Sequence, residues 1–230
     1  MLTLICLISA LVTIFYVSYR LKAKLGSRKI FWLYAVFFLL ATVGYVALIM
    51  TGTYTSDNRY VSVLYVVLGL LFAFHLYFFF LTVVAQVFER YLPGKRGKVA
   101  TVVSVFLAWA IVAAGLYFSH TPRVTEHVVK VKGLAAPVTI MNAPDMHLGP
   151  ARGAGFLKKV LAEIEKRNPD IVVYNGDLID GNIALKEEIF SLFAGVKSPQ
   201  YLTTGNHEFY VDTARELEFA KAAGMKIIRN

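Results

Sequence analysis

Residues 170–181 read DIVVYNGDLIDG, and this stretch decides the fold of the second half of the chain. It begins with an apolar, β-branched run without polar alternation, which is typical of a strand covered on both faces of a parallel sheet. The run ends at a glycine, which is followed by the carboxylates Asp177 and Asp180. A strand that delivers acidic groups at its carboxyl end predicts an α/β protein with its functional groups at that edge.

The same alternation of elements extends to both sides of this stretch. PVTIM, residues 137–141, reads as a strand, and the helical spacing of residues 155–168 stops before a proline. A strand is predicted over 199–206, with further helices over 184–196 and 213–224. Short strands that alternate with helices predict a largely parallel α/β sheet.

Each of the other two predicted strands also ends in polar residues. The first is followed by PDMHLG, which contains Asp145 and His147, and the last by GNHE, which contains Asn206, His207 and Glu208. Taken alone, GNHE favours a simple turn, because glycine and asparagine tolerate the positive φ that turns need. Three such segments in order favour one shared site beyond the strand ends.

The residue types at these strand ends indicate metal chemistry. Mixed Asp, His and Asn ligands suit Mn, Fe or Zn, and a central carboxylate such as Asp177 can bridge two cations. Two divalent ions are the usual apparatus for phosphoester hydrolysis. Gly176 and Gly205 precede the polar residues of two segments, where a tight turn or a close backbone approach is expected.

The ordered motifs D-x-H, G-D-x-x-D and G-N-H-[DE] resemble the first three motifs of the calcineurin-like metallophosphoesterase superfamily, in particular its bacterial membrane-anchored members. The resemblance covers roughly residues 133–230. It implies that Asp145 and His147 ligate one metal ion, that Asp177 bridges two, and that Asn206 ligates the second.

The resemblance also assigns the remaining polar residues. It implies that His207 contacts the phosphate and helps the leaving group depart instead of binding metal. Asp180 and Glu208 would not bind metal and would hold the loops of the site in place through hydrogen bonds. Pro144 stands where members of the superfamily commonly have Ser, and its geometry still fits a strand end.

The superfamily completes its site with a later histidine and a Gly-His-x-His motif, and neither follows Glu208 in these 230 residues. We therefore expect the truncated, N-terminal part of a two-sheet α/β sandwich, with an apolar sheet face left uncovered. Either the sequence is a piece of a longer protein or the protein is a degenerate relative. The former is favoured, because the matching ligands are intact. On this expectation, the 230 residues by themselves hydrolyse phosphoesters poorly.

The first half of the chain is strongly apolar. Hydrophobic residues make up 57% of the sequence and charged residues 17%, which is more apolar than soluble domains usually are. Four runs are each long enough to cross about 30 Å of hydrocarbon: about 2–19, 30–50, 61–88 and 99–118. We predict a four-helix transmembrane region over residues 1–120, a connector over 121–132 and the metallophosphoesterase-like region over 133–230.

Basic residues crowd two of the loops between these runs: Arg20, Lys22, Lys24, Arg28 and Lys29 in the first, and Arg90, Lys95, Arg96 and Lys98 in the other. Because loops rich in Lys and Arg stay in the cytoplasm, the region after residue 120 is predicted to lie outside it. Residues 1–120 contain ten Lys and Arg and two acidic residues. Most of the chain's net charge of +9 therefore comes from the loops between the apolar runs, where basic residues set the membrane orientation. Nucleic acid is not an expected partner.

His75, inside LFAFHLYFFF, is interpreted as a neutral packing residue, although an ionisable residue at mid-membrane is also a functional candidate. The four runs contain no acidic or basic partner for it, which disfavours a transporter. The sequence thus predicts a multi-pass cell-membrane phosphoesterase with two divalent metal ions, acting outside the cytoplasm on a phosphomonoester or phosphodiester, with a lipid-linked phosphate as one candidate substrate. Its predicted partners are the lipid bilayer and the phosphate ester. The alternative is a non-catalytic, metal-binding membrane protein.

Overall fold

The computed structural model describes residues 2–89 and 96–228. The chain divides into two compact units. The first comprises Met1–Thr51 and Leu64–Tyr117, and the second comprises Gly52–Val63 and Phe118–Asn230. Arg90 and Lys95, which belong to the second predicted basic loop, lie outside the described residues.

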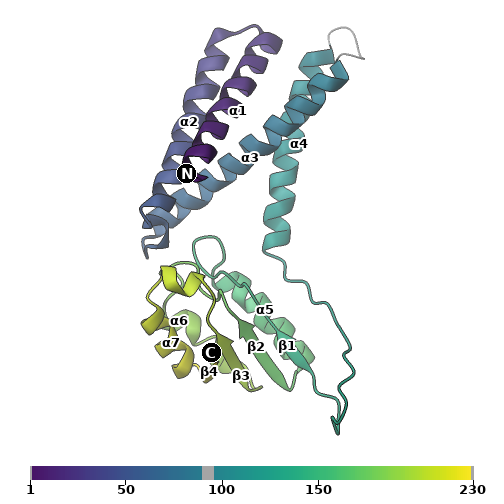
Figure 1. The fold of residues 1–230 in the computed structure, drawn as a ribbon, viewed down its shortest axis with the longest axis vertical. Coiled ribbons are helices and arrows are strands. Elements are labelled where there is room, and N and C mark those ends of the chain that lie inside the picture. The colour runs from purple at the N-terminus through teal and green to yellow at the C-terminus, as the bar shows by residue number, and fades with distance from the viewer. Residues whose placement is uncertain (1, 90–95, 229–230) are drawn as a thin grey trace. The chain divides into compact units, whose positions relative to one another are not determined.

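Long helices make up the first unit (Figure 1): α1 (Leu2–Leu25), α2 (Arg28–Met50), α3 (Arg59–Glu89) and α4 (Arg96–Ser119). Among the described residues, three stretches are long and apolar enough to cross a membrane: Arg28–Met50, Arg59–Glu89 and Gly97–Ser119. The prediction of a membrane protein is thus supported. That α1 forms a fourth span stays a prediction.

Polar side chains join α1, α2 and α3 at defined points. His75 of α3 is fully buried, and its ring nitrogens lie 2.9 Å from the hydroxyls of Thr13 on α1 and Tyr34 on α2. At the far end of α3, Glu89 pairs with Arg20 of α1 at 2.6 Å. Because a polar group in an apolar bundle is costly unless it is paired, these contacts fix which faces of the helices meet.

A parallel sheet forms the second unit, and its strands lie in the order β1-β2-β3-β4 (Figure 1). Its main elements are β1 (Ile140–Asn142), α5 (Ala154–Arg167), β2 (Ile171–Asn175), α6 (Glu187–Phe190), β3 (Gln200–Thr203), α7 (Thr213–Ala222) and β4 (Met225–Ile228). Every neighbouring pair of strands is parallel. The predicted parallel α/β architecture is confirmed.

One face of the sheet forms the core of this unit. Val172 and Tyr174 of β2 are fully buried, in one cluster with residues of α5, α6 and α7. The alternate residues of β2, Ile171 and Val173, are only half-buried. Within the described residues, the prediction that this strand is covered on both faces is therefore confirmed for one face, and the second face is covered only in part. The other face is only partly covered, and Ile140 at the edge is 59% exposed.

The predicted helix over residues 184–196 is much shorter in the structure. Only α6 is α-helical there, and it is followed by the 3-10 turn η2 (Phe193–Gly195). Phe190 and Phe193 both enter the core and are three residues apart, a spacing that suits a 3-10 turn. Packing of these two rings thus replaces the regular helix that the pattern indicated.

Strand β4 was not predicted from the sequence. Gly224 follows α7 with a φ of 86°, a left-handed conformation that commonly ends helices. The chain then turns directly into β4, which pairs with β3 through Gln200 and Met225. Four residues of strand directly behind a helix leave little periodicity to detect.

Candidate metal centre

The loops that follow β1, β2 and β3 meet at one edge of the sheet. The strand register aligns Asn142 with Val173 and Asn175 with Thr203, so the three carboxyl ends lie side by side. The chain then continues into loops that carry all the predicted site residues. The loop after β3 includes the short 3-10 turn η3 (His207–Tyr210).

A histidine from the first loop, an aspartate from the second and a histidine from the third come together. One potential ligand atom each of His147, Asp177 and His207 lies within 4.8 Å of the others. His147 Nε2 is 3.9 Å from Asp177 Oδ2, and the two imidazole rings meet edge-on with centroids 4.5 Å apart. Imidazole and carboxylate ligands suit borderline divalent ions such as Mn, Fe and Zn, so the donor set fits the predicted metals.

Three of the predicted ligands have an unusual backbone conformation. Asp145, His147 and Asp177 are left-handed, with φ values of 51°, 47° and 51°. Such a conformation costs about 1–3 kcal/mol for a residue with a side chain, and it persists where the surroundings impose it. Here, the Asp145 and His147 amides donate to the carbonyl oxygens of Gly176 and Asp177, at 3.2 and 2.9 Å. Strain concentrated at these positions favours a functional site.

Two glycines allow the loops after β2 and β3 to approach each other. A Cβ atom added to Gly176 would come within 3.1 Å of the Gly205 Cα, and Gly176 has a φ of 72°. A Cβ atom added to Gly205 would collide with the Asp177 carboxylate. The close backbone approach predicted at these glycines is confirmed.

Glu208 joins the same two loops through hydrogen bonds to its buried side chain. Its fully buried carboxylate accepts hydrogen bonds from the amides of Asp177 at 3.1 Å, Leu178 at 2.6 Å and Gly205 at 2.5 Å. The His207 amide in turn donates to Asp177 Oδ1 at 3.0 Å. The position of the Asp177 carboxylate is thus determined by the loop after β3 as much as by its own.

Asp180 orients the imidazole of His207. Its Oδ1 lies 2.6 Å from His207 Nδ1, so the bond occupies one ring nitrogen and leaves the other, Nε2, to a different partner. The ring of Tyr210 lies 5.1 Å from the His207 ring, at a steep angle. His207 is therefore held in one orientation, with Nε2 available to a ligand.

The predicted ligand Asp145 is not part of this group, and the predicted ligand Asn206 offers an amide oxygen, a different kind of ligand. Asp145 and Asn206 are exposed, and among the described residues the group of carboxylate and imidazole ligands consists of His147, Asp177 and His207. His207 thus lies where either a metal ion or a phosphate oxygen could reach it. The separate roles implied for these residues stay predictions.

Two further residues near the site were not predicted from the sequence. Arg152 donates to the carbonyl oxygens of Asp145 and Met146, at 3.3 and 3.2 Å, and so closes the first loop. Glu216 of α7 is fully buried, and no described residue hydrogen-bonds its carboxyl oxygens. Burial, and then the nearby Glu208, raise the pKa of Glu216 to about 8. Neither Arg152 nor Glu216 belongs to a sequence motif, so no signal marked them. A glutamate among other charged residues of a helix is normally exposed to solvent, which is why the burial of Glu216 could not be predicted.

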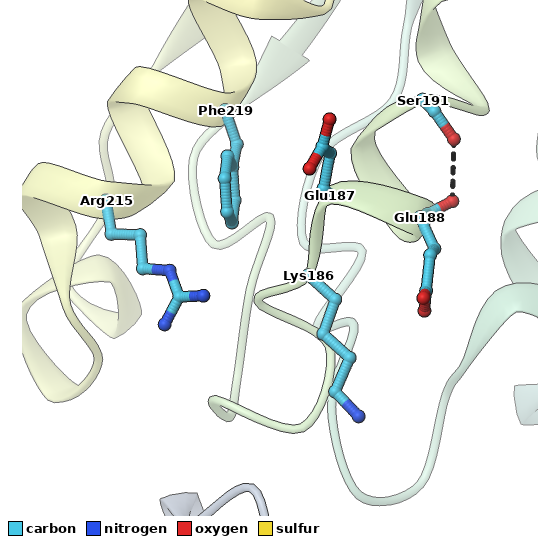
Figure 2. A pocket seen from close by; sticks show the side chains of 6 residues that line it. All are labelled: Lys186, Glu187, Glu188, Ser191, Arg215 and Phe219. Atoms are coloured by element: carbon cyan, nitrogen blue, oxygen red, sulfur yellow. Dashed lines mark hydrogen bonds between the residues drawn. The ribbon is translucent and has the colours of Figure 1, made fainter.

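A separate surface pocket of about 400 Å³ lies between α6 and α7 (Figure 2). It is lined by Lys186, Glu187, Glu188, Ser191, Arg215 and Phe219. In Figure 2 the Ser191 hydroxyl donates to the Glu188 carbonyl oxygen, at 2.9 Å. None of the strand-end loops contributes to this pocket, so it is distinct from the candidate metal centre.

The sequence profile of the calcineurin-like phosphoesterases matches residues 138–229, which include every predicted site residue. These residues belong to the calcineurin-like phosphoesterase superfamily. The predicted resemblance is therefore confirmed for this part of the chain. No solved structure matches the chain.

Curated relatives with the same domain extend the similarity. An uncharacterized metallophosphoesterase of Aquifex aeolicus is 31% identical over 54% of this chain and 49% of its own length. One of Campylobacter jejuni is 28% identical over 94% of this chain and 61% of its own length, so its similarity includes the helical region. A transmembrane protein with metallophosphoesterase domain of Danio rerio is 26% identical over 56% of the chain and 31% of its own length. The chain thus spans from about a third to three-fifths of these relatives.

Proposed function

We propose that the protein is a membrane-anchored, metal-dependent phosphoesterase that hydrolyses a phosphomonoester or phosphodiester. One observation carries the proposal: three strand-end loops of a calcineurin-like region bring the potential ligand atoms of His147, Asp177 and His207 within 4.8 Å. The names of the relatives support hydrolysis of a phosphoester. The relatives' names specify no substrate.

The proposed site uses two divalent ions, which when bound activate a water molecule and neutralise the charge of the phosphate. His147 and Asp177 would hold them together with Asp145 and Asn206, whose exposed side chains extend the donor set at the same edge. Asp177 is suited to the bridging position, because three backbone amides around it are fixed by one buried carboxylate. Mn, Fe or Zn fits these ligands.

His207 would act on the leaving group. Its Nδ1 is hydrogen-bonded to Asp180, which fixes the ring and leaves Nε2 to contact the ester oxygen. A proton on Nε2 can then pass to the departing oxygen as the bond to phosphorus breaks. Asp180 would keep the ring in the orientation that this transfer needs.

The test compares Asp177→Asn with Glu187→Gln, which removes an exposed carboxylate of α6 away from the site. The protein is expressed from its complete gene, purified in detergent, and assayed with chromogenic phosphomonoesters and phosphodiesters while its metal content is measured. Asp177→Asn should lower both metal content and turnover, and Glu187→Gln neither. Metal bound without hydrolysis of any ester by the unmodified protein would favour the non-catalytic alternative.

We also propose that the α/β region lies outside the cytoplasm at the cell membrane, where a lipid-linked phosphate is a fitting substrate. The two basic loops between the apolar helices support this orientation. A reporter enzyme that is active only outside the cytoplasm should be active when it is fused after residue 125. Activity of a cytoplasm-specific reporter at the same position would reverse the orientation and the pool of substrates.

A further inference from the structure

Two segments that border the long helices lie in the same compact unit as the candidate metal centre. One is the α2–α3 loop, defined here as residues 52–58, which contains the 3-10 turn η1 (Thr53–Thr55). The other is His120, which directly follows α4. Both lie outside residues 138–229, so the superfamily match does not account for their contacts.

The α2–α3 loop packs on the backbone that follows Asp180. The amide of Asn182 donates to the carbonyl oxygen of Thr55 at 2.8 Å. A Cβ atom added to Gly181 would lie 3.8 Å from the Thr55 Cα, so the two backbones are in direct contact. Ser56 Oγ beside this contact is buried, as is Asn182 Oδ1. The hydrogen bond between the two backbones therefore lies among partly buried groups, where it is stronger than in bulk water.

The same loop also reaches towards the Asp180–His207 pair. Tyr54 is half-buried, and burial, followed by the proximity of Asp180 and Tyr210, raises the pKa of its phenol. A phenol at this edge can donate a hydrogen bond. Tyr210 itself lies against the His207 ring.

His120 holds the loop after β1 in a similar way. Its Nδ1 lies 3.0 Å from the Ser119 hydroxyl and its Nε2 lies 2.8 Å from the carbonyl oxygen of Ala151. Because the carbonyl can only accept, Nε2 carries the proton and Nδ1 accepts from the hydroxyl. Ala151 is followed by Arg152, which closes the loop that carries His147.

Connectivity makes these contacts possible in either membrane orientation. If α3 and α4 both cross the bilayer, the chain returns after α4 to the side on which the α2–α3 loop lies. The loop and the α/β region then share one aqueous compartment. The shared compartment depends on the number of crossings between the loop and the α/β region and not on the direction of the first one.

We propose that the α2–α3 loop and His120 are positioning elements of the phosphoesterase site. They fix the two loops that present His147 and Asp180 and, through Asp180, the ring of His207. The inference rests on the proposed function. It adds that residues bordering the membrane helices belong to the catalytic unit.

A disulfide tests the first contact without reference to activity. In a Cys6→Ser background, Thr55→Cys combined with Asn182→Cys should form an intramolecular bond under mild oxidation, because residues joined by a backbone hydrogen bond lie within disulfide range. The matched control joins Thr55→Cys with Lys197→Cys, since Lys197 precedes β3 at the opposite edge of the sheet. Failure of the first pair to form, or equal yields from both pairs, would overturn the inference.

Kinetics tests the second contact. His120→Ala should lower kcat roughly three- to tenfold, with KM and metal content unchanged, because a small displacement of the His147 loop misaligns the site. His120→Gln should restore most of the rate, since its amide can still donate to Ala151. His127→Ala, an exposed histidine of the connector, is the control. A rate for His120→Ala equal to that of the control would overturn the role of His120.

The two tests separate this inference from the proposed function. If the disulfide forms but the unmodified protein hydrolyses no phosphoester, the loop contact stands and the proposed function fails. If the unmodified protein is active but the disulfide does not form, the proposed function stands and the inference fails.

Discussion

His75 of the helical unit and His207 of the α/β unit are both held by hydrogen bonds, but they leave different atoms available. Both ring nitrogens of His75 meet hydroxyls, those of Thr13 and Tyr34, and the side chain is completely buried. His207 uses Nδ1 for Asp180, and within the described part of the chain no hydrogen bond occupies its Nε2. The same side chain is therefore saturated in one region and available in the other. The difference teaches that a structural histidine is distinguished from a functional one by whether a ring nitrogen is left without a hydrogen bond, and not by the residue type.

The largest effect is expected from a substitution of His207, whose Nε2 is not hydrogen-bonded within the described part of the chain. His207→Ala should lower kcat for phosphoester hydrolysis roughly 10²–10⁴-fold, the usual contribution of a positioned acid or base. Metal content should stay near that of the unmodified protein, if His207 contacts the phosphate and not a metal ion. Elemental analysis beside the chromogenic assay checks both statements. Loss of metal in this variant would make His207 a ligand, as its distance from His147 and Asp177 permits.

A smaller effect is expected from filling the space between the loops. Gly205→Ala would push a methyl group into the Asp177 carboxylate. We expect a loss of about 1–3 kcal/mol in the free energy of unfolding and a weaker affinity for metal. Gly195→Ala is the control, because a Cβ atom there meets no described atom within 4 Å. Metal titration and thermal unfolding of both variants measure the difference, and equal behaviour would refute the close approach.

The buried Glu216 of the α/β unit is expected to make the stability of that unit depend on pH. Its pKa is about 8 in the folded protein and close to its ordinary value of 4.5 in the unfolded chain, so between these values the folded state binds the extra proton. The stabilisation is therefore complete below the unfolded pKa and is lost as pH rises towards 8. Glu216→Gln should flatten this pH dependence and raise stability at pH 8 by about 1–3 kcal/mol.

Unfolding of Glu216→Gln is compared from pH 5 to 9 with that of Glu218→Gln, a change at an exposed neighbour on α7. The slope of stability against pH should differ between the two variants. Parallel curves would mean that Glu216 finds a partner for its charge in solution.

The smallest effect is expected at the saturated histidine. His75→Leu should leave kcat and metal content unchanged and should lower stability in detergent by about 1 kcal/mol, the usual scale for hydrogen bonds between membrane helices. Val67→Leu, at an exposed position of α3, is the control for changing a helix residue. A loss of hydrolysis in His75→Leu, with folding intact, would break the comparison, because His75 would then take part in function.

Much of the α/β region could be predicted from the sequence. Apolar runs ending at Gly176 and Gly205 indicated strands and loops, and the parallel sheet follows from their alternation with helices. The strand β4 and the brevity of α6 could not be predicted, since tertiary packing of Phe190 and Phe193 overrides the helical pattern.

The site was predictable as a set of residues but not as a geometry. Motif spacing placed Asp145, His147 and Asp177 at strand ends, yet it contains no information on their left-handed backbone. The position of His207 within ligand distance of two predicted ligands also depends on how the loops turn in space. The contacts of Thr55 arise between segments more than 120 residues apart in the sequence, far beyond the window of about 11–18 residues in which periodicity is read.

The sheet order β1-β2-β3-β4 has a consequence for how the protein is made. Each strand pairs with the one that precedes it in the chain, so every pairing becomes possible as soon as the second strand leaves the ribosome. His147 can meet Asp177 when β2 joins β1, and His207 arrives when β3 joins β2. The candidate site can thus assemble in the order of translation, and within the described sheet each strand meets its first partner without waiting for a distant segment.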